Sequence, residues 1–400
     1  MSGVQAFDSL ARVPASEWDA LTGGHPLLCH AFLHALHESG SACAGTGWAP
    51  CYQGLWRNGV LQAAMPLYLK SHSYGEYVFD WAWADAYQRH GLAYYPKLLS
   101  SVPFTPVTGP RLLARAPADR EVLARAALSF ARDAGVSSLH CLFPTETEAR
   151  SLEAAGMMLR STVQFHWKNE GYADFDEFLA RMNHEKRKKI RQERRRLREA
   201  GLEFQRVPGA QASPAQWRFF VECYNRTYRE HHSTPYLNLE FFERLAATMP
   251  DNLVLVIASR DGRPVASAFN VFGAQALYGR YWGTREFHSG LHFEVCYYQA
   301  IEFCIERGIP AFEGGAQGEH KLARGLLPVQ TRSAHWLARP EFSEAVAQFL
   351  GRERRGIEHY VDELSEHSPF KDGNPADKSP RGTLDTLAPK RRDKPAAEER

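Results

Sequence analysis

A segment of fourteen residues, 312–325 (FEGGAQGEHKLARG), combines carboxylates, glycines and cations. Glu313 follows a short apolar run, so it is predicted to end a strand, and the glycines after it allow a sharp turn or close approach to a ligand. A short helix is predicted next, with His320 on it and Lys321 and Arg324 sharing a face. These side chains suit a general base beside an anion clamp. The alternative is a glycine-rich surface turn followed by a solvated helix.

A second carboxylate, Glu294, lies in the first turn of a helix predicted over 293–308. Its helical face continues through Tyr298 and two isoleucines, so it belongs to an otherwise core-facing stripe, where burial would raise its pKa. If Glu294 or Glu313 removes a proton from an attacking amine, Tyr298 is a candidate acid for the leaving group. The alternatives are a first-turn acid that favours the helix dipole and a core tyrosine with a bonded hydroxyl.

The run 186–198 (KRKKIRQERRRLR) has nine basic residues in thirteen positions. A helix of this composition must largely face solvent, with Ile190 and Leu197 as its apolar seam. Three of its basic residues, Lys186, Arg187 and Arg191, are candidates for holding tRNA phosphates, an anionic precursor or the phosphates of a donor. The alternative is a solvated charged face, and no RRM, KH or zinc-finger signature accompanies the run.

An aromatic stretch, DWAWADAY, offers residues for an acceptor groove. Asp80, Trp81 and Trp83 combine flat apolar surfaces with a polar handle, which suits ring-bearing or extended ligands. His166, on a predicted strand near the middle of the chain, is added to this groove. Packing between domains explains the same residues equally well.

The elements that position these residues alternate along the chain. Asn58-Gly59 between two apolar runs predicts a hairpin, followed by helix, strand, helix and strand, and a longer version of this plan recurs in the second half. The sequence therefore predicts a mixed α/β fold of two similar units, residues 1–165 and 166–365. Residues 366–400 contain few large apolar side chains and are predicted to be a disordered tail.

Bulk composition excludes several classes of protein. The formal net charge is +2, so an anionic partner must meet a local patch rather than a global field. The seven cysteines form no CxxC pair, which indicates reduced thiols. No secretory signal is visible, and the longest apolar run, from Leu253, is too short for a bilayer, so a cytoplasmic protein is expected. His288 and His292 have metal-ligand spacing without a third ligand, and no metal site is predicted.

Three stretches together resemble the acyltransferase fold called GNAT, and the doubled unit resembles the FemAB-like group of tandem-GNAT acyltransferases: EKRKKIRQERRRLREAG, GLHFEVCYYQAIEFCIERG and FEGGAQGEHKLARGLLP. The resemblance covers most of residues 1–360 and is greatest to a bacterial branch of predicted N-acyltransferases. It implies that the loop before the second stretch cradles the donor pyrophosphate. Arg285 and Gly290 match the usual pattern of that loop, whereas His288 stands at its first glycine position.

The resemblance implies an N-acyltransferase that moves an acyl or aminoacyl group from acyl-CoA or aminoacyl-tRNA to an amine. Direct attack needs no covalent nucleophile, which agrees with the lack of a GxSxG elbow. Acyl-CoA would be a donor substrate, and no permanently bound cofactor is expected. The alternative is a non-catalytic tandem-GNAT protein that holds RNA or another anionic ligand through 186–198. The acyl group, the acceptor, the choice between Glu294 and Glu313, and the oligomeric state stay open.

Overall fold

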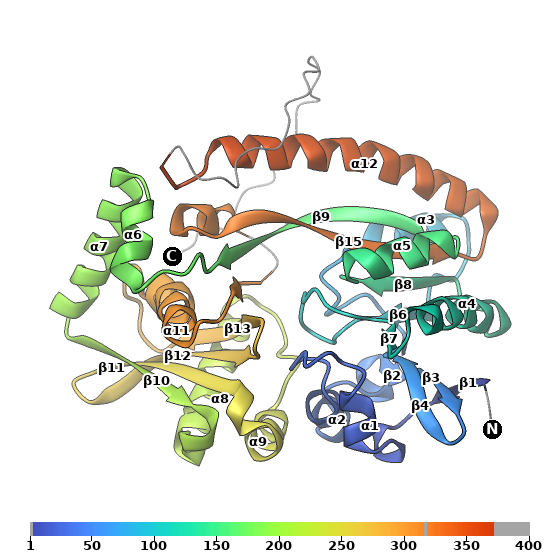
Figure 1. Ribbon diagram of the computed structural model, residues 1–400, viewed down its shortest axis with the longest axis horizontal. Coiled ribbons are helices and arrows are strands. Elements are labelled where there is room, and N and C mark those ends of the chain that lie inside the picture. The colour runs from blue at the N-terminus through green and yellow to red at the C-terminus, as the bar shows by residue number, and fades with distance from the viewer. Residues whose placement is uncertain (1–2, 316–317, 372–400) are drawn as a thin grey trace.

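The computed structural model describes residues 3–315 and 318–371 (Figure 1). Its strands are β1 (Gly3–Phe7), β2 (Trp48–Pro50), β3 (Tyr52–Arg57), β4 (Val60–Met65), β5 (Tyr68–Lys70), β6 (Lys97–Ser100), β7 (Leu113–Ala114), β8 (Ser138–Leu142), β9 (Met158–Lys168), β10 (Leu202–Pro208), β11 (Leu253–Arg260), β12 (Arg263–Phe272), β13 (Ala276–Thr284), β14 (Ala311–Glu313) and β15 (Leu327–Leu337). Eleven of them form one mixed sheet in the order β10-β11-β12-β13-β14-β9-β15-β8-β6-β5-β2. The others form a smaller antiparallel sheet, β1-β3-β4-β7.

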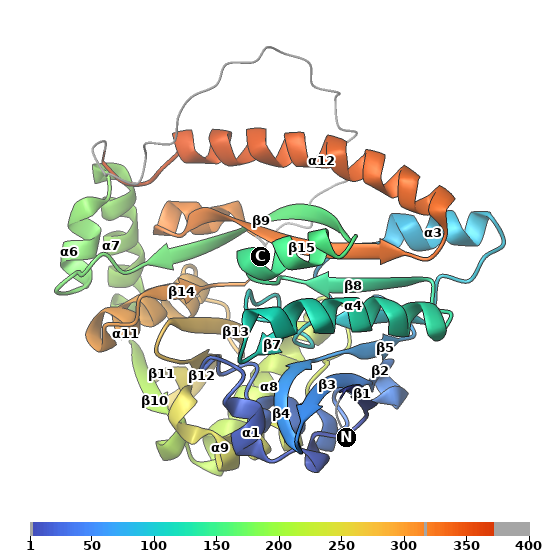
Figure 2. The same ribbon diagram turned by 45° about the vertical axis from the view of Figure 1, so that its right-hand side comes forward.

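Helices cover both faces of the large sheet (Figures 1 and 2). They are α1 (Ala15–Asp19), α2 (His30–Glu38), α3 (Trp81–Arg89), α4 (Pro117–Asp133), α5 (Glu146–Ala154), α6 (Phe175–Arg181), α7 (His184–Glu199), α8 (Pro214–Glu230), α9 (Leu239–Thr248), α10 (Leu291–Phe293), α11 (Gln299–Arg307) and α12 (Pro340–Glu366). A π-helical turn, Glu294–Tyr298, joins α10 to α11, and a 3-10 helix spans Glu319–Arg324. The long helix α12 lies across β9 and β15.

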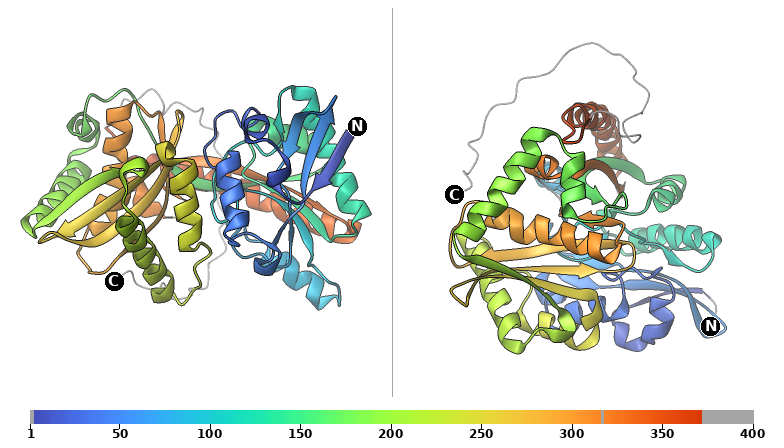
Figure 3. Two further views of the ribbon diagram at one scale, coloured as in Figure 1. Left: turned by 90° about the horizontal axis from the view of Figure 1, so that it is seen from below. Right: turned by 60° about the vertical axis from the view of Figure 1, so that its left-hand side comes forward.

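The centre of the large sheet is an antiparallel pair of long strands, β9 and β15, which run between the two halves (Figure 3). Thr162 faces Thr331 at the middle of the pair, with their hydroxyl oxygens 2.8 Å apart. β9 continues to pair with β14 of the C-terminal half, whereas β15 continues to pair with β8 of the N-terminal half. Each half therefore completes its part of the sheet with a strand that the other half also uses.

The same pairing pattern occurs on both sides of this central pair. On one side, β5 pairs antiparallel with β6, β6 pairs parallel with β8, and β8 pairs antiparallel with β15. On the other side, the same three directions occur in the pairs β12–β13, β13–β14 and β14–β9. Four residues beyond each central threonine, His166 faces Glu313 and His335 faces His140. The register thus makes Glu313 and His140 equivalent positions of a duplicated α/β unit.

The two halves also share a hydrophobic core. Phe32 of α2 packs edge-on against Phe241 of α9, with ring centroids 5.6 Å apart, and Phe104 stacks on Tyr236 at 4.8 Å. One continuous cluster of buried side chains includes residues from α2, α8, α9 and β11. Apolar burial therefore joins the halves in addition to the strand pairing.

Most elements expected from the sequence are present. The hairpin at Asn58-Gly59 joins β3 to β4, and both of these turn residues have positive φ. The helix expected over 293–308 starts at Leu291 and contains the π-helical turn. The strand expected from Thr331 begins at Leu327, because Pro328 and the residues beside it pair with β9.

The domain limits 1–165 and 166–365 stay a prediction, and their junction falls within β9. Of the segment 366–400, the structure describes only 366–371. There Phe370 pairs with Met182 and packs against Phe178. The rest of the predicted tail lies outside the described residues.

Candidate active site

The candidate site lies where β13 and β14 part. β14 pairs with only the first three residues of β13 and ends at Glu313, whereas β13 continues to Thr284. Arg280 is an extra residue in β13, because the register with β12 passes from Gly279 to Tyr281. A cavity of about 70 Å³ lies in this opening. Such a bulge beside an opened sheet is a common way to place a functional side chain.

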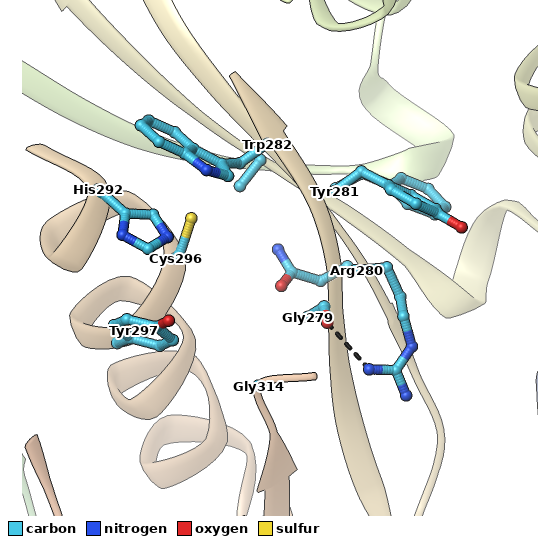
Figure 4. A pocket seen from close by; sticks show the side chains of 11 residues that line it. Gly279, Arg280, Tyr281, Trp282, His292, Cys296, Tyr297 and Gly314 are labelled. Carbon is cyan, nitrogen blue, oxygen red and sulfur yellow. Dashed lines mark hydrogen bonds between the residues drawn. The ribbon is translucent and has the colours of Figure 1, made fainter. Parts of the chain in front are cut away.

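Several elements supply the lining of the cavity (Figure 4). β13 contributes Gly279 to Trp282, the helical segment contributes His292, Cys296 and Tyr297, and Gly314 closes the end of β14. Ala268, Phe269 and Asn270 of β12 complete the lining. Figure 4 shows the guanidinium of Arg280 on the opposite side of β13 from His292 and Cys296.

Glu313 immediately precedes Gly314, which lines the cavity, and 11% of the Glu313 side chain is exposed. Burial raises the pKa of Glu313 to about 7, and the Arg280 guanidinium only partly offsets that effect. Arg280 Nη2 lies 3.6 Å from Glu313 Oε2, which is an ion-pair distance but too long for a hydrogen bond. Among the described residues, Glu313 Oε2 has no hydrogen-bond partner. A carboxyl group held this way can exchange a proton near neutral pH.

The segment after Glu313 folds back beside it, as the sequence predicted for a short helix. Lys321 Nζ donates a hydrogen bond to Gly315 O at 3.0 Å, and burial together with Arg280 lowers the pKa of Lys321 to about 8. The ring of His320 lies 3.2 Å from the hydroxyl of Tyr297, which lines the cavity. Arg324, by contrast, points to α7.

The cluster around Arg324 contains the other predicted catalytic side chains. Arg324 Nη2 donates to Glu193 Oε1 at 3.0 Å, and Tyr298 donates its hydroxyl proton to Glu193 Oε2. Glu294 receives a two-pronged ion pair from Arg194, with Nε–Oε2 at 3.0 Å and Nη2–Oε1 at 2.9 Å. Both oxygens of Glu294 are therefore occupied, and the geometry favours Glu313 as a proton acceptor.

The predicted donor loop does not border the cavity. Arg285 is paired with Glu222 of α8, and His288 lies 3.2 Å from Glu286. Gly290 has a φ of 87° and starts α10, which explains a glycine at this position. Within 3–315 and 318–371, no group of three or more potential ligand side chains is placed to hold a metal ion.

The basic run forms α7, with Ile190 and Leu197 buried as expected. Arg194 is buried with them, because its guanidinium is neutralised by Glu294 and Glu302. The candidate anion-binding residues lie towards the surface: Arg191 pairs with Asp176, Lys186 pairs with Glu185, and Arg187 reaches Ala180 O.

The predicted acceptor residues fall into two places. His166 faces Glu313 across the β9–β14 pair, so the two share one face of the sheet. Asp80, Trp81 and Trp83 lie in the N-terminal half: Asp80 is ion-paired with Lys97, Trp83 packs on His335, and Trp81 is exposed. Asp80 and Trp83 lie beside His140, the position equivalent to Glu313.

Sequence reasoning missed Arg280 and the inward role of Glu193 and Arg194. A lone cation in the aromatic strand ALYGRYWGT was the available signal for Arg280. No local signal in the run 186–198 distinguishes Glu193 and Arg194, which point inward, from the charged residues around them.

The fold is a mixed α/β fold of two GNAT-like units. A family model described as peptidoglycan biosynthesis and recognition matches residues 9–372. The chain belongs to this FemAB-like family, which confirms the resemblance seen in the sequence.

Solved structures with a similar fold have low sequence identity. FemX matches with a TM-score of 0.52 at 12% identity, covering 84% of this chain and 98% of FemX. L-PGS from Bacillus licheniformis matches with a TM-score of 0.51 at 12% identity, covering 84% of this chain and 97% of that one. A tandem GNAT protein from the clavulanic acid biosynthesis pathway scores 0.44 at 11% identity, with coverages of 85% and 99%. The curated proteins contain no match.

Among the described helices, none is long and apolar enough to cross a bilayer.

Proposed function

We propose that the protein is an N-acyltransferase in which Glu313 is the general base. FemAB-like membership and the fold support acyl or aminoacyl transfer in general. The observation that carries the finer proposal is a buried carboxylate with a pKa of about 7 at the end of β14, beside the opening between β13 and β14. A base with this pKa is matched to proton transfer at neutral pH.

The reaction is direct transfer between two bound substrates. The acceptor amine attacks the carbonyl carbon of a thioester or ester donor, a C–N bond forms, and the C–S or C–O bond breaks. Glu313 takes the proton that the amine nitrogen loses. The sulfur or oxygen of the donor leaves with the electron pair of the broken bond and receives that proton from Glu313, directly or through water, to give the free thiol or hydroxyl. Acyl-CoA and aminoacyl-tRNA are the proposed donor classes, because both present an activated carbonyl group.

The opening between the strands would orient the donor. In the part of the chain that the structure describes, no strand pairs with β13 beyond Tyr278 on the side of β14, so an extended arm of a donor can lie against this edge. Holding both substrates there supplies the positioning on which a reaction without a covalent intermediate depends.

The Glu313→Gln variant tests the proposal. Turnover, measured with acetyl-CoA and with an aminoacyl-tRNA as separate donors, should fall by roughly 10²- to 10⁴-fold, because the amide cannot accept the proton. Glu306→Gln is the matched control, since Glu306 is an exposed carboxylate on α11 that pairs with Arg206. Full activity in a folded Glu313→Gln protein would reject Glu313 as the base.

A second candidate is a binding protein that holds RNA through α7. The observation in its favour is that six basic residues of this helix are exposed: Lys188, Lys189, Arg191, Arg195, Arg196 and Arg198. Mobility shifts with tRNA at several salt concentrations test it, because a phosphate-driven complex must weaken steeply as salt rises. No binding at low salt removes this candidate.

A further inference from the structure

The guanidinium of Arg280 is buried without a full set of partners. Only 4% of its side chain is exposed, and Nη1 donates to Gly279 O at 3.0 Å. Among the described residues, neither Nε nor Nη2 has a hydrogen-bond partner. These two atoms form the side-on edge with which arginine binds carboxylates and phosphates in a two-pronged manner.

Other arginines of the chain show how this edge is normally used. Arg194 places Nε and Nη2 on the two oxygens of Glu294, and Arg160 does the same with Glu353 at 2.8 Å for both bonds. Arg280 has Glu313 beside it, but at 3.6 Å the carboxylate does not occupy the edge. An unmet buried donor pair is costly, so its retention calls for a ligand.

The charges around Arg280 are predominantly positive. Arg111 is buried, and its guanidinium donates to backbone carbonyls, including Leu142 O at 2.9 Å, rather than to a carboxylate. Lys321 is buried nearby and also bonds a backbone carbonyl. His25 and His166 are held neutral, because burial and then neighbouring cations, Arg280 among them, lower the pKa of His25 to about 3 and that of His166 to about 4. Glu313 is the carboxylate that acts on Arg280, and Glu148, which acts on Arg111, already accepts hydrogen bonds from backbone N–H groups. The positive charge at Arg280 therefore favours a bound anion.

We propose that the acceptor is an amine that itself carries a carboxylate or phosphate group, whose oxyanion binds the side-on edge of Arg280 while its nitrogen meets Glu313. This inference rests on the proposed function, and it adds the chemical class of the acceptor. Two groups 3.6 Å apart can both be reached by hydrogen bonds of about 2.8 Å from a small molecule whose amine and oxyanion lie a few bonds apart. One to three carbon atoms between them satisfy that spacing.

Binding to the full chain in the absence of a donor tests the inference, with isothermal titration calorimetry as the measurement. Phosphoethanolamine and β-alanine carry an amine near a phosphate or a carboxylate. Ethanolamine and methyl phosphate each lack one group, and 6-aminohexanoate has a longer spacer whose ordering on binding costs more conformational entropy. We expect one of the first two probes to bind at least ten-fold more tightly than all three others, and the preferred one identifies the oxyanion.

Arg280→Lys keeps the charge but removes the side-on edge, so it should weaken the preferred probe at least ten-fold and leave ethanolamine unchanged. Arg226→Gln, which alters an exposed arginine paired with Glu230 on α8, is the matched control. Equal binding of ethanolamine and phosphoethanolamine, or no effect of Arg280→Lys, overturns the inference. If Arg280→Lys fails to fold, the comparison of probes with the unaltered protein still decides.

The same measurements separate this inference from the proposed function. A probe that binds as expected but receives no acyl group from either donor argues against the transferase and leaves the oxyanion site standing. Acyl transfer to ethanolamine at the same rate as to phosphoethanolamine or β-alanine would support the transferase and reject this acceptor class.

Discussion

Glu294 and Glu313 are both buried beside an arginine, yet their hydrogen bonds differ. Glu294 accepts two bonds from Arg194 and one from Gln299 at 2.8 Å. Glu313 has an ion-pair neighbour at 3.6 Å, and its pKa is raised to about 7. The first arrangement occupies both oxygens of Glu294 with hydrogen-bond donors, whereas the second leaves Glu313 able to gain and lose a proton.

The pH dependence of turnover should report on Glu313. A general base acts in its deprotonated form, so kcat/KM is expected to rise with pH and to level off above a pKa of about 7. The groups around Glu313 are Arg280 and Tyr278 from β13, Arg111, and His166 from β9; of these, the histidine has its pKa lowered to about 4. Lys321, with a pKa of about 8, would add a decline at higher pH if its charge is required.

A steady-state pH profile between about 5 and 9 checks this prediction, with the donor held saturating. A rate that falls as pH rises through 7 would mean that a protonated group is needed, contrary to the proposed role of Glu313.

At the scale of elements, α7 is anchored through charges that point inward. Arg194 joins it to Glu294 and Glu302 on the helical segment 291–307, and Glu193 joins it to Arg324 and Tyr298. Six of the remaining basic residues are exposed, and Lys186 and Arg187 are half-buried. Within one charged run, Glu193 and Arg194 therefore fix the helix to the rest of the protein, while other basic residues form a cationic surface.

Replacing Glu294 by Gln should mainly affect stability. The substitution leaves Arg194 short of a buried counter-charge, which costs about 3–5 kcal/mol of unfolding free energy in comparable cases. Urea unfolding of the variant, compared with Glu306→Gln, measures this loss. Turnover per folded molecule should change much less than in Glu313→Gln. The opposite result, unchanged stability with lost turnover, would make Glu294 the base.

Local patterns in the sequence predicted the elements but not these pairings. Turn residues and helical spacing identified the hairpin, α7 and the helix that contains Glu294, because those signals lie within a few residues of one another. Arg194 and Glu294 are a hundred positions apart, and Arg280 lies in a bulge whose register depends on β12. The residue types of 312–325 made Glu313 a candidate base, the family resemblance favoured that function over a surface turn, and the structure supplied Arg280 as its neighbour.

At the scale of the whole molecule, the duplicated unit places different chemistry at its two equivalent positions. Where the C-terminal half has Glu313 opposite His166, the N-terminal half has His140 opposite His335, with their Nδ1 atoms 2.8 Å apart. Burial and the nearby Lys97 lower the pKa of His140 to about 3. The proposed base is therefore present in only one of the two units.

The shared central strands predict that neither half folds alone. In a chain cut after Glu170, the first fragment contains β9 but lacks β15, which pairs with β8. The second fragment contains β15 but lacks β9, which pairs with β14. Each fragment should lack a cooperative unfolding transition by circular dichroism, and co-expression should restore a complex on size-exclusion chromatography. Cooperative unfolding of either fragment by itself would contradict this.

The position of β15 in the chain also affects how the protein is made on the ribosome. β8 ends at Leu142, but its partner β15 starts only at Leu327, so one edge of β8 waits for a strand that has not yet been translated. At ~5–20 residues per second, that wait is on the order of ten to forty seconds. An apolar strand edge exposed for so long is a site of mispairing, and chaperone demand during synthesis should be greatest in this interval.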